Sequence, residues 1–356
     1  MIKQEYFLGT TSPTGFRTDF KQQIDRPGMY TYILKGGPGT GKSTLMKRIA
    51  ESFDGENISL YRCSSDINSL DAAVMEDRNF MIVDGTAPHV FEADLPGISQ
   101  EIINLGAFWD GNKLCDHADA VRYCFAENAK YHRRVRYYAQ AISALCTDIY
   151  EFSAESLDRL KLAAYAERLA KKLIHDSIGK KGKTEYRQLS ALTTDNYKTL
   201  PIEGDLSRYF IRDDNLAGGD MLLRMLSEKF TQSGYDVIIS KFNMLDRPSY
   251  EHMICRQLGL SFTTGNFFNK QCPSGESIIN FARFYKKDEL DRKKQRINFD
   301  KKASLELADE AAASLKIALD IHDRLEKFYI AALDINRINE MTEKFIDKLK
   351  NKTICR

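Results

Sequence analysis

Several features are scarce or missing in this sequence, and each absence narrows what the protein can be. No apolar run approaches the roughly 20 residues needed to cross a bilayer, and the N-terminal residues lack the basic-then-apolar pattern of a signal peptide. The seven cysteines include no C-x-x-C pair, and the six scattered histidines suggest no zinc site. We therefore expect reduced thiols in a cytoplasmic protein with no membrane partner.

An excess of charge of one sign is also lacking, because 52 Lys and Arg are balanced by 50 Asp and Glu. The net charge of +2 argues neither for nor against a nucleic-acid partner. Glycine and proline are absent from residues 112–178 and again from 276–356. Long spans without these helix breakers, rich in Ala, Leu, Lys and Glu, predict long helices, and residues 153–156 are the expected bend in the first span.

Residues 30–49 read YTYILKGGPGTGKSTLMKRI and contain the most informative motif of the chain. Residues 30–34 are β-branched and aromatic, which favours a buried strand. The following residues 36–43 fit G-x-x-x-x-G-K-[ST] at every fixed position, and apolar residues then recur at helical spacing. The motif therefore lies in the strand–loop–helix context that a phosphate-binding loop requires.

This pattern predicts a nucleoside triphosphate site that takes ATP and Mg²⁺. Glycines allow successive backbone N–H groups to point at phosphate oxygens, and the helix turns its positive end toward the same anion. Lys42 would bind the β- and γ-phosphates, the Ser43 hydroxyl would ligate Mg²⁺, and Thr44 would contact the α-phosphate. The expected nucleotide-binding residues are Gly36, Gly37, Pro38, Gly39, Thr40, Gly41, Lys42, Ser43 and Thr44.

A second apolar run, residues 80–83, is closed by Asp84 and is typical of a parallel strand buried on both faces. We expect Asp84 to be the carboxylate partner of Ser43 on Mg²⁺, and to be catalytic together with Lys42. No glutamate follows Asp84, so the residue that activates water is not identified. Asp66 and His89 could polarise a nucleophile, but a capping or hydrogen-bonding role in a loop is the favoured interpretation of both.

Basic side chains gather at two places in the predicted helices. Residues 131–138 mix arginines with aromatic residues, and residues 292–296 form a second basic run. Either could contact a protein or nucleic-acid partner, although a solvated helix face is the favoured interpretation. Residues 179–187 begin with GKKGKT and are interpreted as a basic, flexible linker.

Beyond this linker the sequence repeats itself without the chemistry. Residues 32–53 align with 209–230 without a gap, and 102–109 align with 278–285. Opposite Gly36, Gly37, Lys42 and Ser43 stand Asp213, Asp214, Gly219 and Asp220, and Thr264 stands opposite Asp84. The loop thus loses a cation and gains three carboxylates. Repulsion on the order of several kcal/mol predicts that no triphosphate binds there.

Together these features resemble a family of duplicated bacterial P-loop ATPases, most of which are known only as ATP-binding proteins. The residues that carry the resemblance are 33–43, 63–66, 84–89 and 101–106, and it is vaguer beyond about the first third of the chain. It implies an ATP-binding α/β lobe that is repeated within one chain. Members often carry two intact loops, and this sequence departs from them in the second, so a two-site cooperative mechanism is not implied for it.

The expected fold is α/β, a three-layer α/β/α P-loop NTPase fold in two tandem lobes that each carry a helical hairpin arm. The active lobe is expected at 1–178 with its arm at about 112–178, the linker at 179–187, and the degenerate lobe at 188–356 with its arm at about 286–356. The expected function is Mg²⁺-dependent ATP hydrolysis in the N-terminal lobe. The alternatives are a small-molecule or nucleotide kinase with the same ATP site, and an ATP-gated module that binds protein or nucleic acid with little turnover.

Overall fold

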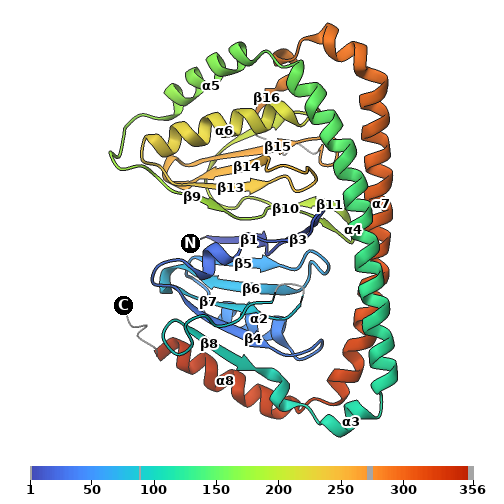
Figure 1. Ribbon diagram of the computed structural model, residues 1–356. Helices are drawn as coiled ribbons and strands as arrows, with labels where there is room; N and C mark the ends of the chain where they lie inside the picture. Colours follow the sequence, from blue (N-terminus) through green and yellow to red (C-terminus); the bar gives the residue numbers. More distant parts are fainter. Residues whose placement is uncertain (1, 88–89, 271–275, 352–356) are drawn as a thin grey trace. The chain divides into compact units, whose positions relative to one another are not determined.

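The structure is a computed structural model that describes residues 2–87, 90–270 and 276–351. The chain divides into two compact units. The first unit comprises Met1–Gly9, Thr18–Val135 and Ala312–Arg356, and the second comprises Thr10–Arg17 and Arg136–Ala311. Each unit combines helices with a six-stranded sheet that contains parallel strand pairs, so the mixed α/β class expected from the sequence is confirmed (Figure 1).

The sheet of the first unit carries its strands in the order β1-β5-β6-β7-β4-β8. These strands are β1 (Lys3–Phe7), β4 (Tyr30–Lys35), β5 (Ile58–Arg62), β6 (Leu70–Met75), β7 (Phe80–Asp84) and β8 (Gln100–Asn104). The pairs β1/β5, β4/β7 and β4/β8 are parallel, whereas β6 runs antiparallel to both of its neighbours. The carboxyl ends of the parallel strands β4 and β7 therefore meet at one edge of the sheet, which is where open α/β sheets bind ligands.

The sheet of the second unit has the order β9-β13-β14-β15-β12-β16 when it is read from β9. Its strands are β9 (Thr184–Tyr186), β12 (Ser207–Arg212), β13 (Val237–Lys241), β14 (Tyr250–Cys255), β15 (Leu260–Gly265) and β16 (Ser277–Asn280). Only β14 is antiparallel to its neighbours. Corresponding strands thus follow one another in the same order and direction in both sheets. The second unit also holds two hairpins, β2 (Thr10–Ser12) with β3 (Gly15–Arg17) and β10 (Ser190–Thr193) with β11 (Asn196–Thr199).

The helices are α1 (Lys21–Ile24), α2 (Lys42–Ser52), α3 (Gly111–Cys115), α4 (Ala118–Glu155), α5 (Arg159–Leu173), α6 (Ala217–Gln232), α7 (Lys287–Ala331) and α8 (Ile335–Asn351). Long helices fill the breaker-free spans, as the sequence predicts, and they are α4, α5, α7 and α8. Short 3₁₀ turns lie at η1 (Glu76–Arg78), η2 (Leu105–Phe108), η3 (Arg256–Leu258) and η4 (Phe281–Phe284). The expected bend at 153–156 is confirmed, because α4 ends at Glu155 and α5 begins at Arg159.

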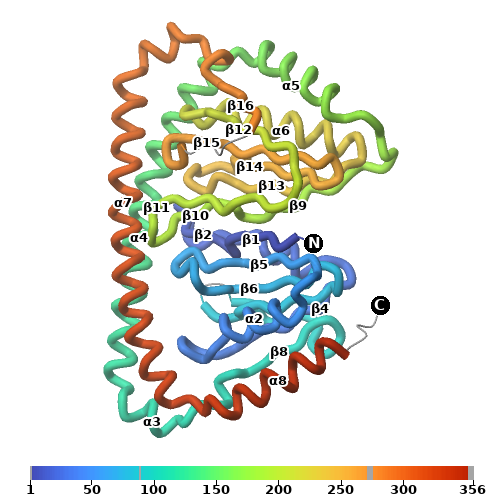
Figure 2. The backbone as a smooth tube through the Cα atoms, turned by 180° about the vertical axis from the view of Figure 1, so that it is seen from behind, coloured from blue at the N-terminus to red at the C-terminus, as the bar shows by residue number. Residues whose placement is uncertain are grey.

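The last helix, α8, packs on the sheet of the first unit, although it follows the second sheet in sequence (Figure 2). Its buried Phe345, Ile346 and Leu349 join the core that β4 and α2 form. The ring of Phe345 meets Tyr32 edge-on with 5.0 Å between centroids. Helix α5 likewise buries its apolar face with α6 in the core of the second unit. Each sheet is thus covered by a helix from the hairpin that follows the other sheet.

The compact units are therefore not the consecutive lobes 1–178 and 188–356 expected from the sequence. The first unit includes the end of the second helical arm, and the second unit includes α5 from the first arm. Residues 179–187 are not a linker throughout, because β9 pairs with β13 within this range. Amphipathic spacing predicts that one face of a helix is buried, but it does not identify the sheet against which that face packs.

Within the described ranges, no helix has both the length and the apolar character that spanning a membrane would require.

Two carboxylates meet where α4 and α7 pack within the second unit. Asp300 of α7 is only 4% exposed. Burial and the neighbouring carboxyl of Asp148 raise the pKa of Asp300 to about 6. Arg296 binds Asp148 through Nε and Nη2, at 2.8 and 2.7 Å, and lowers the pKa of Asp300 by a smaller amount. The contact between α4 and α7 thus contains a buried acid whose ionised form destabilises the folded state.

We expect Asp300→Asn to raise the free energy of unfolding at pH 7–8 by on the order of 1 kcal/mol. The pKa of Asp300 is near 6 in the folded chain against an ordinary 3.8, so the wild type loses stability as the pH rises from about 4 through 6. The asparagine variant lacks this loss, and the two proteins converge below pH 4. Urea unfolding across pH 4–8 measures the difference, with Asp291→Asn on the exposed face of α7 as the control. Parallel profiles for Asp300→Asn and the wild type would contradict the expectation.

Candidate functional site

The glycine-rich loop joins the end of β4 to the first residue of α2 at the carboxyl edge of the first sheet. Gly39 and Gly41 adopt φ of +67° and +79°, a conformation that is strained for residues with a side chain. Gly41 is the N-cap of α2, and no side chain caps this helix. The N–H groups of the first turn of α2 are therefore available to an anion, and the helix dipole favours one there.

Lys42 lies inside this loop. Its Nζ donates to the carbonyl oxygens of Gly36 and Gly37 at 2.9 and 2.8 Å, and lies 3.6 Å from Asp84 Oδ2. The side chains of Lys42 and Asp84 are 12% and 13% exposed, so this ion pair is largely shielded from solvent. Thr40 closes the loop with a 2.8 Å hydrogen bond from its Oγ1 to Gly37 O. The structure thus brings together the cation and the carboxylate that the sequence predicted for one site.

The sheet register places Asp84 beside the loop strand. Leu34 of β4 pairs with Asp84 of β7. Asp84 Oδ1 accepts hydrogen bonds from the backbone and the hydroxyl of Thr86, at 2.9 and 2.6 Å, while Oδ2 faces the lysine. Ser43 Oγ accepts the N–H of Leu70 at 2.9 Å, which leaves its own hydrogen and a lone pair for other partners. Hydroxyl and carboxylate oxygens are ligands that Mg²⁺ prefers, so Ser43 and Asp84 fit this ion.

A second buried carboxylate, Asp71, adjoins Asp84. It precedes Ala72, which pairs with Val83 across the antiparallel strands β6 and β7. Asp71 is 7% exposed, and burial, followed by the negative charge of Asp84, raises its pKa to about 8, whereas Lys42 lowers it. Near neutral pH Asp71 is therefore mostly protonated, and the charges at the site are the Asp84 carboxylate and the Lys42 ammonium group.

Sequence reasoning missed Asp71 because it recognised no strand at Leu70–Met75. The signal was present, since LDAAVM is a short apolar run with a single carboxylate near its start. The run has little of the β-branched content that usually identifies a strand, and all six of its residues are buried because it lies in the interior of the sheet, between β5 and β7.

The remaining predicted residues are less central. Asp66 accepts the N–H of Asn68 at 3.1 Å and the hydroxyl of Ser69, so it closes the turn before β6, as the favoured interpretation has it. His89 lies outside the described residues. Thr44 is exposed on the first turn of α2. The basic clusters of the arms are solvated, with Arg134 exposed beside Tyr131 of its own helix.

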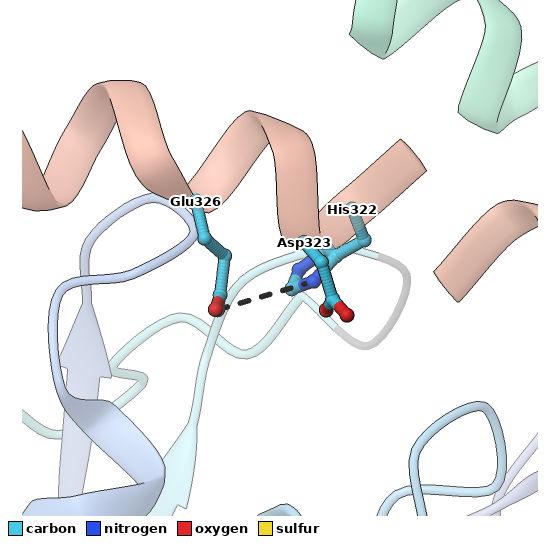
Figure 3. Close-up of side chains that lie close together, drawn as sticks. All are labelled: His322, Asp323 and Glu326. Atoms are coloured by element: carbon cyan, nitrogen blue, oxygen red, sulfur yellow. Dashed lines mark ion pairs between the residues drawn. The ribbon is translucent and has the colours of Figure 1, made fainter. Parts of the chain in front are cut away.

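A carboxylate from a distant part of the sequence also reaches the loop. Glu326 of α7 accepts the N–H of Gly39 through Oε1, at 3.1 Å. Figure 3 shows Glu326 beside His322 and Asp323 on the same helix, and His322 Nδ1 lies 3.9 Å from the same Oε1 atom. One ligand atom from each of these three residues lies within 4.8 Å of the others, although Asp323 is exposed. No pattern in the sequence links residue 326 to residue 39.

The corresponding loop of the second unit, between β12 and α6, is filled by its own carboxylate. Asp213 Oδ2 accepts the N–H of Gly219 at 2.8 Å, and Oδ1 accepts the hydroxyl of Tyr285 at 2.9 Å. Burial raises the pKa of Asp213. Leu216 has φ +67°, the same value as Gly39 in the first loop. The two loops thus share a left-handed residue at this aligned position, and in the second loop an acidic side chain binds the N–H groups.

Asp220 completes the contrast between the loops. It stands in the register position of Ser43, and its Oδ1 accepts the N–H of Tyr250 at the start of β14, at 2.7 Å. The Tyr150 hydroxyl donates to its Oδ2 at 2.8 Å, and Arg224 Nε donates to Oδ1 at 2.9 Å. Thr264 pairs with Ile211 and so takes the place that a metal-binding carboxylate would need.

No family model matches this chain, and neither a curated protein nor a solved structure matches it.

We expect Asp71→Asn to raise the free energy of unfolding at pH 7 by roughly 1–3 kcal/mol without nucleotide. Its pKa is about 8 in the folded chain against an ordinary 3.8, so the wild type loses stability as the pH rises from about 4 through 8. Chemical unfolding at pH 4, 6 and 8 measures this loss, and the exposed Asp54→Asn serves as a charge-matched control. A variant that is less stable than the wild type at pH 8 would refute the burial argument.

Proposed function

We propose that this chain is a duplicated P-loop NTPase that binds ATP and Mg²⁺ in the first unit and hydrolyses ATP slowly. One observation carries the proposal. The Lys42 ammonium group lies within a glycine-rich loop at the N-terminus of a helix, 3.6 Å from the Asp84 carboxylate that closes the neighbouring strand. A loop of N–H groups, a shielded cation and a carboxylate are what binding of a metal-complexed polyphosphate requires.

Different residues of the site would bind the phosphates and the metal ion. The N–H groups of residues 39–43 and the start of α2 would bind the phosphates, and Lys42 would turn from the loop carbonyls to the β- and γ-phosphate oxygens. Ser43 and Asp84 would hold Mg²⁺, which neutralises charge on the phosphates when it is bound. Negative charge that develops as the terminal phosphoryl group transfers to water would be stabilised by Lys42 and the loop N–H groups.

The same proposal covers the second unit, as a pseudo-NTPase that keeps the fold. Its support is the matching strand order of the two sheets and the equal φ of Gly39 and Leu216. The pairing of Thr264 with Ile211, where Asp84 pairs with Leu34, extends this correspondence across the sheet. Asp213 already occupies the loop N–H groups there, so a triphosphate would meet a negative charge in place of a lysine.

Lys42→Ala is expected to weaken ATP–Mg²⁺ binding about 100-fold, because it removes charge-assisted hydrogen bonds to two phosphates. Asp84→Asn is expected to remove the Mg²⁺ dependence of binding while the strand remains intact. Calorimetric titration measures both, and Lys47→Ala, an exposed cation one turn further along α2, is the matched control. Equal affinity of Lys42→Ala and the wild type would rule out the loop as the nucleotide site.

The stoichiometry is expected to be one ATP per chain, with all binding lost when the first loop is impaired. The reason is the charge reversal of the second loop, where the carboxylate of Asp213 lies buried on Gly219 N–H. Equilibrium dialysis with labelled ATP at saturating concentration measures the number of sites. Two equivalents per chain, or one equivalent that survives Lys42→Ala unchanged, would show that the second loop is functional.

A further inference from the structure

The nucleotide loop of the first unit is covered by the C-terminal end of α7. A Cβ atom added to Gly39 would lie 3.0 Å from the carbonyl oxygen of Glu326 and from the side chain of Ile330. A Cβ on Gly37 would lie 3.2 Å from the ring atoms of both Trp109 and Tyr329. The helix therefore lies directly against the loop, and the glycines leave just enough room for it.

The contact is also chemical, since Glu326 Oε1 accepts the Gly39 N–H at 3.1 Å. This N–H belongs to the loop just before the positive end of α2, and it is among the N–H groups that phosphate oxygens would use. A carboxylate offers the same kind of ligand, a negatively charged oxygen, and forms a charge-assisted hydrogen bond. One N–H cannot serve both oxygens at this distance. A triphosphate that uses Gly39 must therefore displace Glu326.

We propose that Glu326 is an internal competitor of the nucleotide and forms an autoinhibitory contact that ATP–Mg²⁺ releases. This inference rests on the proposed function of the loop and adds its regulation. In the second unit Asp213 belongs to the loop itself and is 2% exposed, so it stays on the N–H groups. The Glu326 side chain is 35% exposed and comes from a separate helix, so it can be exchanged for another anion.

Glu326 makes few contacts that a phosphate would have to replace. Its Oε1 has the Gly39 N–H as a donor and the imidazole of His322 at 3.9 Å (Figure 3). A triphosphate would gain several loop N–H groups and Lys42 at once, so it outcompetes a single carboxylate hydrogen bond. Removing the competitor must then raise the apparent affinity, because the competent state becomes more populated.

The chain carries its own reporter of this contact. Trp109 is the only tryptophan of the sequence, and its ring packs on Tyr329 of α7 with 5.1 Å between centroids. Both rings also lie against Gly37, so displacement of Glu326 by a phosphate in the loop would change their surroundings and the tryptophan emission. Nucleotide affinity and the α7 contact can thus be followed in one titration of the full chain.

The experiment titrates the wild type, Glu326→Gln and Glu326→Ala with ATP–Mg²⁺ and with inorganic tripolyphosphate, by calorimetry and by Trp109 emission. Both variants are expected to bind about tenfold more tightly than the wild type. Asp323→Asn removes the same charge from an exposed residue of the same helix and is expected to leave the affinity unchanged. Damage to the fold would weaken binding, so tighter binding cannot arise from it.

The outcomes separate the two proposals. Binding that appears only in the Glu326 variants, or that tightens in them, supports the competitor. Equal or weaker binding by the variants of a wild type that does bind ATP overturns the competitor and leaves the nucleotide site in place. Absence of ATP and tripolyphosphate binding from all three proteins overturns both. An emission change on nucleotide addition that is the same in wild type and variants, with unchanged affinity, also counts against the competitor.

Discussion

One physical constraint applies to both units: the start of a helix favours a negatively charged partner. In each sheet the loop strand runs into a helix whose first N–H groups have no partner within the helix. In each unit a carboxylate accepts an N–H group near this point: Glu326 binds Gly39 in the loop before α2, and Asp213 binds Gly219 in the first turn of α6. The difference lies in where the carboxylate comes from. Asp213 belongs to the loop itself and is buried, whereas Glu326 belongs to α7, near the end of the sequence.

Glu326 follows the second sheet in sequence and yet lies in the first unit. Helix α7 contributes residues to both units, since its 45 residues include the boundary at Ala311 and Ala312. Helix α8 then buries Phe345 and Leu349 in the core of the first sheet. The chain turns between α7 and α8 close to η2, where Asp110 N donates to Ala332 O at 2.8 Å and Asp334 N donates to Phe108 O at 3.0 Å. These bonds join the end of α7 to the segment that follows η2.

The sequence predicted the parts of the site that rest on local spacing. The loop at 36–43, the strand that ends in Asp84 and the long helices follow from motif, apolar runs and the lack of glycine and proline. It did not predict the parts that depend on tertiary contact. Asp71 is significant only because the register of β6 sets it beside Asp84, and Glu326 only because α7 packs on Gly39. The sequence predicted the loss of the cation from the second loop. It did not predict that Asp213 would itself bind the N–H groups of that loop.

The central claim is that the first loop is an anion site and the second is its self-occupied counterpart. A crystal structure of the full chain with a non-hydrolysable ATP analogue and Mg²⁺ tests it most directly. The account predicts a triphosphate on the N–H groups of residues 39–43, with Lys42 turned to its oxygens and Glu326 withdrawn from Gly39. A nucleotide bound at Asp213, or one bound away from both loops, would contradict it.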